Sequence, residues 1–287
     1  MPEPAAFRLA LCNEVVRELT FPEQCDLAAR LGYDALEVAP FTLVDDPREL
    51  QSSDVRRLKK MAEEAGVGVS SLHWLLTSPE GLSITTADVD VRRETLEVMD
   101  ALVNVCAELG GDVLVHGSPG QRELSPEDPD GDAQRGAEAF AKIAEVAQAA
   151  GVVYCIEPLS PQETAFINTV AQAEEIVARV GSPALRTMLD TRAARLSETE
   201  PVAAVLERGL RAGTIAHVHV NDSSKLAPGQ GEDTFAEVFD VLLRLGYRGT
   251  MAVEPFVYEP SGVASAARSI GYVKGLLEGL EFARSAS

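Results

Sequence analysis

The sequence predicts a single (β/α)8 barrel over residues 1–287. Short apolar runs alternate with helical segments eight times along the chain, and such alternation is typical of a parallel sheet that closes on itself. No stretch rich in Pro, Gly or Ser divides the chain, which indicates one domain. A doubly wound open sheet is the competing architecture, but it would normally carry a Gly-rich loop after the first strand, and none is present.

Each predicted strand is a short apolar run that stops at a polar or turn residue. The strands are Phe7 to Cys12, Ala35 to Val38, Val67 to Leu72, Val113 to Val115, the runs that end at Glu157 and at Asp190, the run from Thr214 through His219, and Thr250 to Val253. Since parallel strands of a barrel all end on the same face, polar residues at these ends are expected to converge.

The predicted helices follow the strands and show the usual start and stop signals. Thr20 and Glu23 form a T-x-x-E capping box for the first helix, which runs to about Leu31 and stops at Gly32. The others cover about Pro47 to Ala65, Ala87 to Leu109, Ala133 to Ala150, Val170 to Val180, Pro201 to Ala212, a helix capped by Thr234 and Glu237 that runs to Leu245, and Val263 to Ala283. Ser118 to Asp132 is predicted to be a loop over the site.

Composition and charge exclude several classes of protein. With 46% hydrophobic residues the chain can bury a large core, and its net charge of −20 disfavours nucleic acid as a partner. Its four cysteines show no CxxC spacing, which indicates reduced, buried thiols and a cytoplasmic location. Neither a secretory signal nor a run of membrane-spanning length is seen, so we expect no membrane association.

Four of the predicted strands in the second half end on residues that bind metals. Glu157, Asp190 and Glu254 end three of them, and the run TIAHVHVND places His217 and His219 on one face of the fourth. One of these histidines can be a ligand while the other packs against it. Three carboxylates and one imidazole suit a divalent ion, preferably Mn²⁺, with Co²⁺, Mg²⁺ or Zn²⁺ as alternatives.

Each acid taken alone is as well explained as a helix-initiating residue or an ion-pair partner. Together, at the ends of four consecutive strands, they favour a metal site. Glu157 and Glu254 come from the outer two of these strands, so they can reach opposite sides of a bound ligand. That arrangement is what a proton transfer with two bases requires.

Further candidate substrate-binding side chains lie at strand ends or in the loops that follow: His73, Trp74, His116, Glu163, Arg192 and Lys225. His73 and His116 end strands on the other half of the barrel, and each is as readily a packing residue. Lys225 could hold a substrate oxygen, although most loop lysines are only solvated. Arg192, with its neighbour Arg195, could bind an anionic group or neutralise local acids.

The motifs IEPLSPQE, MLDT, HVHVND and VEPF together resemble those of the xylose isomerase-like barrels, which include ketose 3-epimerases, hydroxypyruvate isomerase and inosose dehydratase. The resemblance covers nearly the whole chain. It implies that Glu157, Asp190, His219 and Glu254 bind one divalent metal ion, with His219 rather than His217 as the ligand. It also implies that Glu157 and Glu254 transfer the proton.

The same resemblance sets limits on the substrate. The 3-epimerases keep a substrate-contacting His three residues after the ligand Asp, where this chain has Ala193. Lys225 stands where they keep an arginine, which preserves the charge but loses the bidentate fork. The chain also resembles the endonuclease IV branch, which binds three zinc ions. It lacks the additional histidines of that branch, and its charge disfavours DNA.

The sequence therefore predicts a metal-dependent isomerase or epimerase of a small ketose or polyhydroxy carbonyl compound, acting through an enediolate. A dehydratase of an inosose-type substrate would use the same enediolate, and a non-catalytic sugar-binding barrel is the alternative outside enzymology. A small carbohydrate is the expected partner. Barrels of this family often dimerise, so a homodimer is a further expectation.

Overall fold

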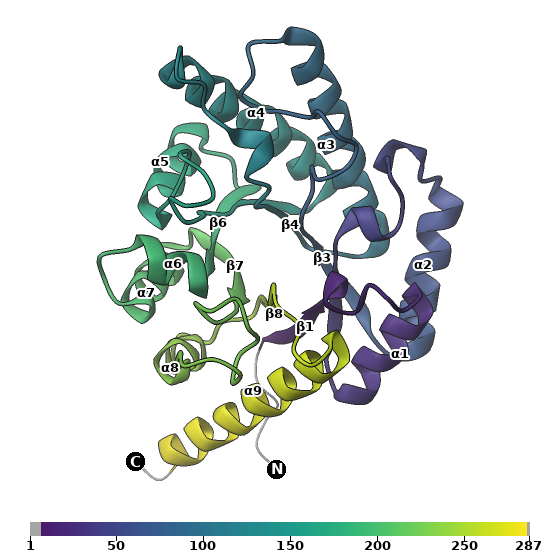
Figure 1. Cartoon of the computed structure of the whole chain (residues 1–287), viewed down its shortest axis with the longest axis vertical. Helices are drawn as coiled ribbons and strands as arrows, with labels where there is room; N and C mark the ends of the chain where they lie inside the picture. Colours follow the sequence, from purple (N-terminus) through teal and green to yellow (C-terminus); the bar gives the residue numbers. More distant parts are fainter. Residues whose placement is uncertain (1–6, 286–287) are drawn as a thin grey trace.

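The computed structural model describes residues 7–285. Within that range, eight parallel strands close into a barrel in chain order, with helices around the outside (Figure 1). The strands are β1 (Arg8–Cys12), β2 (Ala35–Val38), β3 (Gly68–Leu72), β4 (Val113–His116), β5 (Val153–Ile156), β6 (Leu185–Asp190), β7 (Ile215–Val220) and β8 (Thr250–Val253). The predicted (β/α)8 fold is confirmed.

The outer layer consists of the helices that connect successive strands and of α9, which follows β8 and runs along the outside of the barrel toward the C-terminus (Figure 1). They are α1 (Phe21–Leu31), α2 (Ser52–Ala65), α3 (Val89–Leu109), α4 (Pro129–Ala150), α5 (Val170–Val180), α6 (Thr191–Ser197), α7 (Val202–Ala212), α8 (Ala236–Arg244) and α9 (Gly262–Ser285).

The register of the strands brings the carboxyl ends of β6, β7 and β8 level with one another. Asp190 pairs with His219, and His219 pairs with Ala252, two residues before Glu254. The polar ends of these strands therefore share one rim. Below this rim the apolar strand residues are buried together with the inner faces of the helices in one large cluster. That packing gives the rim a rigid base.

Several helices begin or end at the capping and glycine residues that predicted their ends. The capping box of Thr20 and Glu23 is present at the start of α1. At the end of α3, Gly110 has φ 90°, and its N–H donates to the carbonyls of Cys106 and Ala107. A side chain at that φ would be strained, so glycine suits the turn into β4.

Three helix starts differ from prediction. The helix expected from Pro47 begins with a 3-10 turn, Pro47–Glu49, which two extended residues, Leu50 and Gln51, separate from α2. α4 begins at Pro129, because Asp128 caps it through the N–H of Gly131 and proline suits a first helical position. The cap expected from Thr234 is wrong: the N-cap of α8 is the buried Phe235, and no side chain caps this helix.

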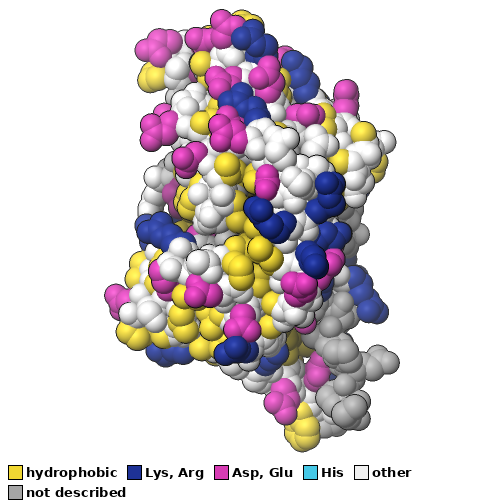
Figure 2. Space-filling model, turned by 90° about the vertical axis from the view of Figure 1, so that its right-hand side faces the viewer, with side chains coloured by type: hydrophobic (Ala, Val, Ile, Leu, Met, Phe, Trp, Pro, Cys, Tyr) yellow, Lys and Arg dark blue, Asp and Glu magenta, His cyan; other side chains and the backbone are white. Residues whose placement is uncertain are grey.

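The surface carries charges of both signs. Figure 2 shows acidic and basic side chains interspersed over one flank, with apolar patches between them. That flank offers no uniformly basic surface of the kind that polyphosphate backbones select. All four cysteines are buried and unpaired, as expected. No helix within residues 7–285 combines the length and the apolar character that crossing a membrane would need.

Candidate metal centre and active site

Four side chains from consecutive strands meet at the carboxyl rim of the barrel. Glu157 follows β5, Asp190 ends β6, His219 lies in β7 and Glu254 follows β8. One donor atom from each lies within 4.8 Å of the donor atoms of the others, and all four side chains are buried. We call these four residues the rim cluster. The structure thus brings together the four residues that the sequence proposed as metal ligands.

The rim cluster concentrates negative charge away from solvent. Burial, with added repulsion from Glu157 and Glu254, raises the pKa of Asp190 to about 7. Burial likewise raises the pKa of Glu157, and the negative charge of Glu254 contributes to that rise. Carboxylates held together in this way are costly unless a cation or proton lies among them.

Asp190 Oδ2 is buried without a hydrogen-bond partner. His219 Nδ1 also makes no well-aligned hydrogen bond, but it lies 2.9 Å from Glu254 Oε2 and 3.5 Å from Glu157 Oε1, inside the cluster. The other oxygen of Asp190, Oδ1, accepts from the N–H of Ala193 at 2.6 Å and so is already engaged. An unpaired carboxylate oxygen and an imidazole nitrogen directed at two further carboxylates are the ligand set that divalent ions such as Mn²⁺ prefer. The residues present therefore fit a divalent cation.

The imidazole ring of His219 is oriented by a hydrogen bond to Glu37, a fully buried carboxylate on β2. Nε2 of His219 donates to Glu37 Oε1 at 2.6 Å, which leaves Nδ1 directed at the rim cluster. The Ser71 hydroxyl donates to Glu37 Oε2 at 2.5 Å, and His217 Nε2 lies 2.6 Å from the same oxygen. Burial alone would raise the pKa of Glu37, but His217 and His219 hold the pKa of this carboxyl well below its usual range.

Glu254 is held in the same manner by His73. The imidazole of His73 donates from Nδ1 to Glu254 Oε1 at 3.0 Å and from Nε2 to Glu14 Oε2 at 2.9 Å. Burial alone would lower the pKa of His73, but Glu14 and Glu254 raise it to about 10. His73 is therefore a buried cation that positions Glu254, and it is not among the residues that line the cavity described next.

A cavity of about 50 Å³ opens directly onto the rim cluster. Its lining consists of Trp74, Gly117, Pro119, Glu157, Leu159, Glu163, Glu254 and Phe256. Trp74 and Phe256 meet edge to face, with ring centroids 6.3 Å apart. The predicted substrate-binding residues Trp74 and Glu163 thus share one cavity with the two glutamates expected to move the proton.

Gly117 makes room for one of these glutamates. A Cβ at this position would lie 1.7 Å from Glu157 Oε2. Since real atoms cannot approach so closely, any side chain at position 117 would displace the carboxylate. Gly117, the residue after β4, therefore defines where the carboxylate of Glu157 lies and is part of the site.

Three other residues that the sequence proposed for substrate binding do not line this cavity. His116 shares a hydrogen bond between Nδ1 and the Tyr154 hydroxyl at 2.8 Å, and burial lowers its pKa to about 3. Arg192 donates to Glu163 at 3.0 Å and lies over the Phe256 ring, so it borders the cavity indirectly. Lys225 is exposed and is not among the lining residues.

Three buried charged residues at or near the site were missing from the sequence-based set: Glu14, Glu37 and Arg122. Glu37 had a detectable signal, because a glutamate inside the apolar strand ALEV needs a buried partner. Glu14 lies two residues after the first strand, so its position at a strand end is close to the signal used for the other acids. Arg122 lies in a loop segment with no such pattern.

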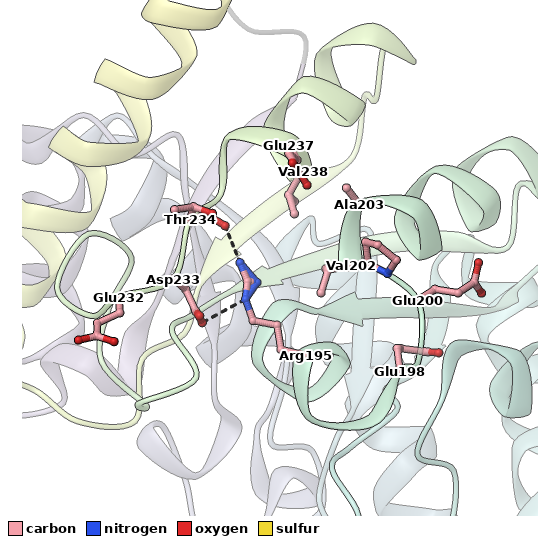
Figure 3. A pocket seen from close by; sticks show the side chains of 11 residues that line it. Arg195, Glu198, Glu200, Val202, Ala203, Glu232, Asp233, Thr234, Glu237 and Val238 are labelled. Carbon is pink, nitrogen blue, oxygen red and sulfur yellow. Dashed lines mark hydrogen bonds and ion pairs between the residues drawn. The ribbon is translucent and has the colours of Figure 1, made fainter.

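A second groove, of about 420 Å³, lies between α7 and the segment that leads into α8 (Figure 3). Arg195 occupies it, with Nε 3.2 Å from Asp233 Oδ2 and its guanidinium over the Phe235 ring. Arg195, which the sequence suggested as an anion-binding residue, is therefore engaged with these neighbours and does not line the rim-cluster cavity.

The family model for xylose isomerase-like TIM barrels matches residues 25–285. The chain belongs to this family. It is 27% identical over 246 residues to the D-psicose 3-epimerase of Ruminiclostridium cellulolyticum, covering 84% of this chain and 80% of that protein. It is 30% identical over 229 residues to the L-ribulose 3-epimerase of Mesorhizobium japonicum, covering 79% of this chain and 73% of that protein.

A solved epimerase structure shares the fold. A D-psicose 3-epimerase with D-tagatose from Clostridium cellulolyticum H10 superposes with a TM-score of 0.81 at 20% identity, covering 94% of this chain and 99% of that one. Together with the named relatives, this confirms the family predicted from the motifs and the expectation of an enzyme of the isomerase and epimerase class.

Proposed function

We propose that this member of the xylose isomerase-like family epimerises or isomerises a ketose, or a related polyhydroxy carbonyl compound, with the help of one divalent metal ion. The observation that carries the proposal is the rim cluster. Its four donor side chains lie within 4.8 Å of one another, are buried, and open onto a cavity that two of them line.

Glu157, Asp190, His219 and Glu254 would hold the metal ion, and Mn²⁺ is our first choice because the donors are mainly carboxylates. When bound, the ion would supply Lewis-acid chemistry that acidifies the substrate C–H next to the carbonyl and stabilises negative charge on oxygen. In its absence, Glu254 and Glu37 raise the pKa of His219 well above its usual value, although burial opposes this. Loading the site would therefore release a proton from His219.

The two glutamates would move the substrate proton. Glu157 and Glu254 both line the cavity and come from strands β5 and β8, which flank β6 and β7 in the barrel. One carboxylate would accept the proton from the carbon beside the carbonyl, leaving an enediolate. The other would return a proton from the opposite side, which inverts that carbon. Trp74, Leu159 and Phe256 would exclude water from the reacting carbon.

The substrate class rests on the relatives, which are named epimerases of D-psicose, L-ribulose and fructoselysine. Each of these names denotes a ketose or a ketose derivative. Ala193, which is buried, leaves no polar side chain at the position where the resemblance places a substrate-contacting histidine. The cavity of about 50 Å³ has the volume of one or two water molecules, so we expect the side chains around it to move apart when a sugar enters.

The test is to measure metal content and turnover together. Wild type, His219→Ala and the matched surface variant Glu63→Gln would be reconstituted with Mn²⁺, Co²⁺, Mg²⁺ and Zn²⁺. They would then be assayed on ketopentoses, ketohexoses, ketose acids and inososes, with product analysis by NMR. We expect about one equivalent of metal in wild type and Glu63→Gln, almost none in His219→Ala, and turnover only with metal.

Two results would change the assignment. Absence of metal uptake by folded wild-type protein would overturn the mechanism and favour a sugar-binding barrel. A dehydrated product from an inosose, without epimerised ketose, would move the protein to the dehydratase alternative.

A further inference from the structure

Arg122 is a fully buried arginine whose guanidinium has no partner. Its side chain has zero exposure, and none of Nε, Nη1 and Nη2 makes a hydrogen bond to the described residues. Nor does it form an ion pair within residues 7–285. A guanidinium carries five N–H donors, and each donor left unpaired in the interior costs free energy. Such a group needs a partner that the chain itself does not provide.

The position of Arg122 relates it to the substrate cavity. It lies in the 3-10 turn Gly120–Arg122, which follows the cavity-lining residues Gly117 and Pro119. Arg122 is not itself among the lining residues, so a ligand reaches its guanidinium only when the cavity widens, as expected on entry of a sugar. The backbone N–H of Arg122 donates to the carbonyl of Pro119 at 3.2 Å, so the turn is tied to the cavity wall.

The charge of Arg122 is not used by a neighbouring acid. Glu163, which is close enough to influence it, already pairs with Arg192 at 3.0 Å, and Glu157 belongs to the rim cluster. Burial lowers the pKa of Arg122 to about 10, while Glu157 and Glu163 oppose that shift. The guanidinium is thus a cation at neutral pH. Two of its electrostatic neighbours, Glu157 and Glu163, line the cavity, and a third, His116, does not.

We infer that Arg122 binds an anionic group on the substrate, so that the preferred substrate is an acidic ketose rather than a neutral one. This rests on the proposed function and narrows it. Carboxylate and phosphate oxygens match the planar donor fork of a guanidinium and form its strongest hydrogen bonds. A carboxylate and a phosphate ester share this chemistry, and the experiment separates them.

Binding can be measured without turnover because Trp74 is the only tryptophan in the chain and lines the cavity. Its fluorescence would be titrated in the metal-loaded enzyme with three unreactive polyols: sorbitol, gluconate and sorbitol 6-phosphate. We expect one of the two anionic polyols to bind about 10- to 100-fold more tightly than sorbitol, the loss expected when a charge-assisted bidentate contact is missing.

The variants then assign that preference to one residue. Arg122→Gln should bring the anionic polyol down to the affinity of sorbitol, and Arg122→Lys should keep part of the preference because the charge remains. Arg179→Gln, which removes an exposed arginine on α5, is the matched control and should bind like wild type. Equal affinities for all three polyols in wild type, or an unchanged preference in Arg122→Gln, would overturn the inference.

Stability provides an independent readout. If Arg122 serves a ligand, replacing it removes an unpaired buried charge, so ligand-free Arg122→Gln should melt at or above the temperature of wild type. A markedly lower melting temperature, or failure to fold, would show that the guanidinium is structural and would overturn the inference. Turnover of neutral ketoses with no effect of Arg122→Gln would reject this inference alone, whereas absence of any ketose turnover with metal would reject the proposed function.

Discussion

Glu37 offers the sharpest test of how the rim cluster is built. Its Oε1 accepts the Nε2–H of His219 at 2.6 Å, and this bond fixes the tautomer that leaves Nδ1 free for a metal ion. Glu37→Gln keeps an acceptor oxygen for that bond but removes the charge. Glu37→Ala removes the acceptor, so the ring of His219 is free to rotate and to change its tautomer.

The size of the effect follows from the bonds lost. A hydrogen bond to a charged group stabilises by about 1.5–3 kcal/mol and a neutral one by about 0.5–1.5 kcal/mol. The Gln variant should therefore lose about 1.4 kcal/mol of metal binding, which is about tenfold in affinity. The Ala variant should lose about 2.7 kcal/mol, or about 100-fold, the upper end of what loss of such a partner costs.

The assay is competition for Mn²⁺ against a chelator of known affinity, with Glu63→Gln on the exposed face of α2 as the control. Circular dichroism and thermal melting of the metal-free proteins would establish that each variant is folded. A folded Glu37→Ala protein whose affinity for Mn²⁺ is within threefold of the wild-type affinity would refute the reasoning. His219 would then not need the hydrogen bond to Glu37 in order to bind metal.

Two further predictions concern local geometry. In Gly117→Ala the new Cβ would stand 1.7 Å from Glu157 Oε2, so the carboxylate must shift, and kcat should fall by about 100-fold while the fold is kept. Steady-state kinetics beside circular dichroism would check this, and wild-type kcat would count against the placement of Glu157. Thr169→Ala removes the capping box at the start of α5, where Thr169 and Gln172 exchange bonds of 3.2 Å. This variant should have a free energy of unfolding about 1 kcal/mol lower than wild type and a melting temperature about 2 °C lower. An unchanged melting curve would contradict that role for Thr169.

Much of the fold follows from local patterns. Apolar runs that stop at polar residues predicted the strands, and the capping box at Thr20 predicted the start of α1. Periodicity and caps are short-range properties, so a linear reading can detect them. The short helix α6 was missed because it is only seven residues long and its cap, Asp190, had been assigned to the metal site. Oδ1 of this side chain accepts from the N–H of Ala193 and caps α6, and we propose that Oδ2 binds the metal ion.

The contacts between the rim cluster and the buried residues that orient it could not be predicted from the sequence. Glu37 lies on β2, and its bond to His219 joins residues 182 positions apart. His73 reaches Glu254 across 181 positions. No spacing rule connects such residues, because the contact exists only after the barrel has closed and brought its first half against its last.

By itself, the sequence determined the order of strands and helices and the four polar strand ends at Glu157, Asp190, His219 and Glu254. Parallel strands in a barrel must end on one face, so this much follows from topology. Only the tertiary structure decided which nitrogen of His219 faces the other three and which buried arginine has no partner. Those features depend on side-chain orientation and on exclusion of water, which arise from packing between distant segments.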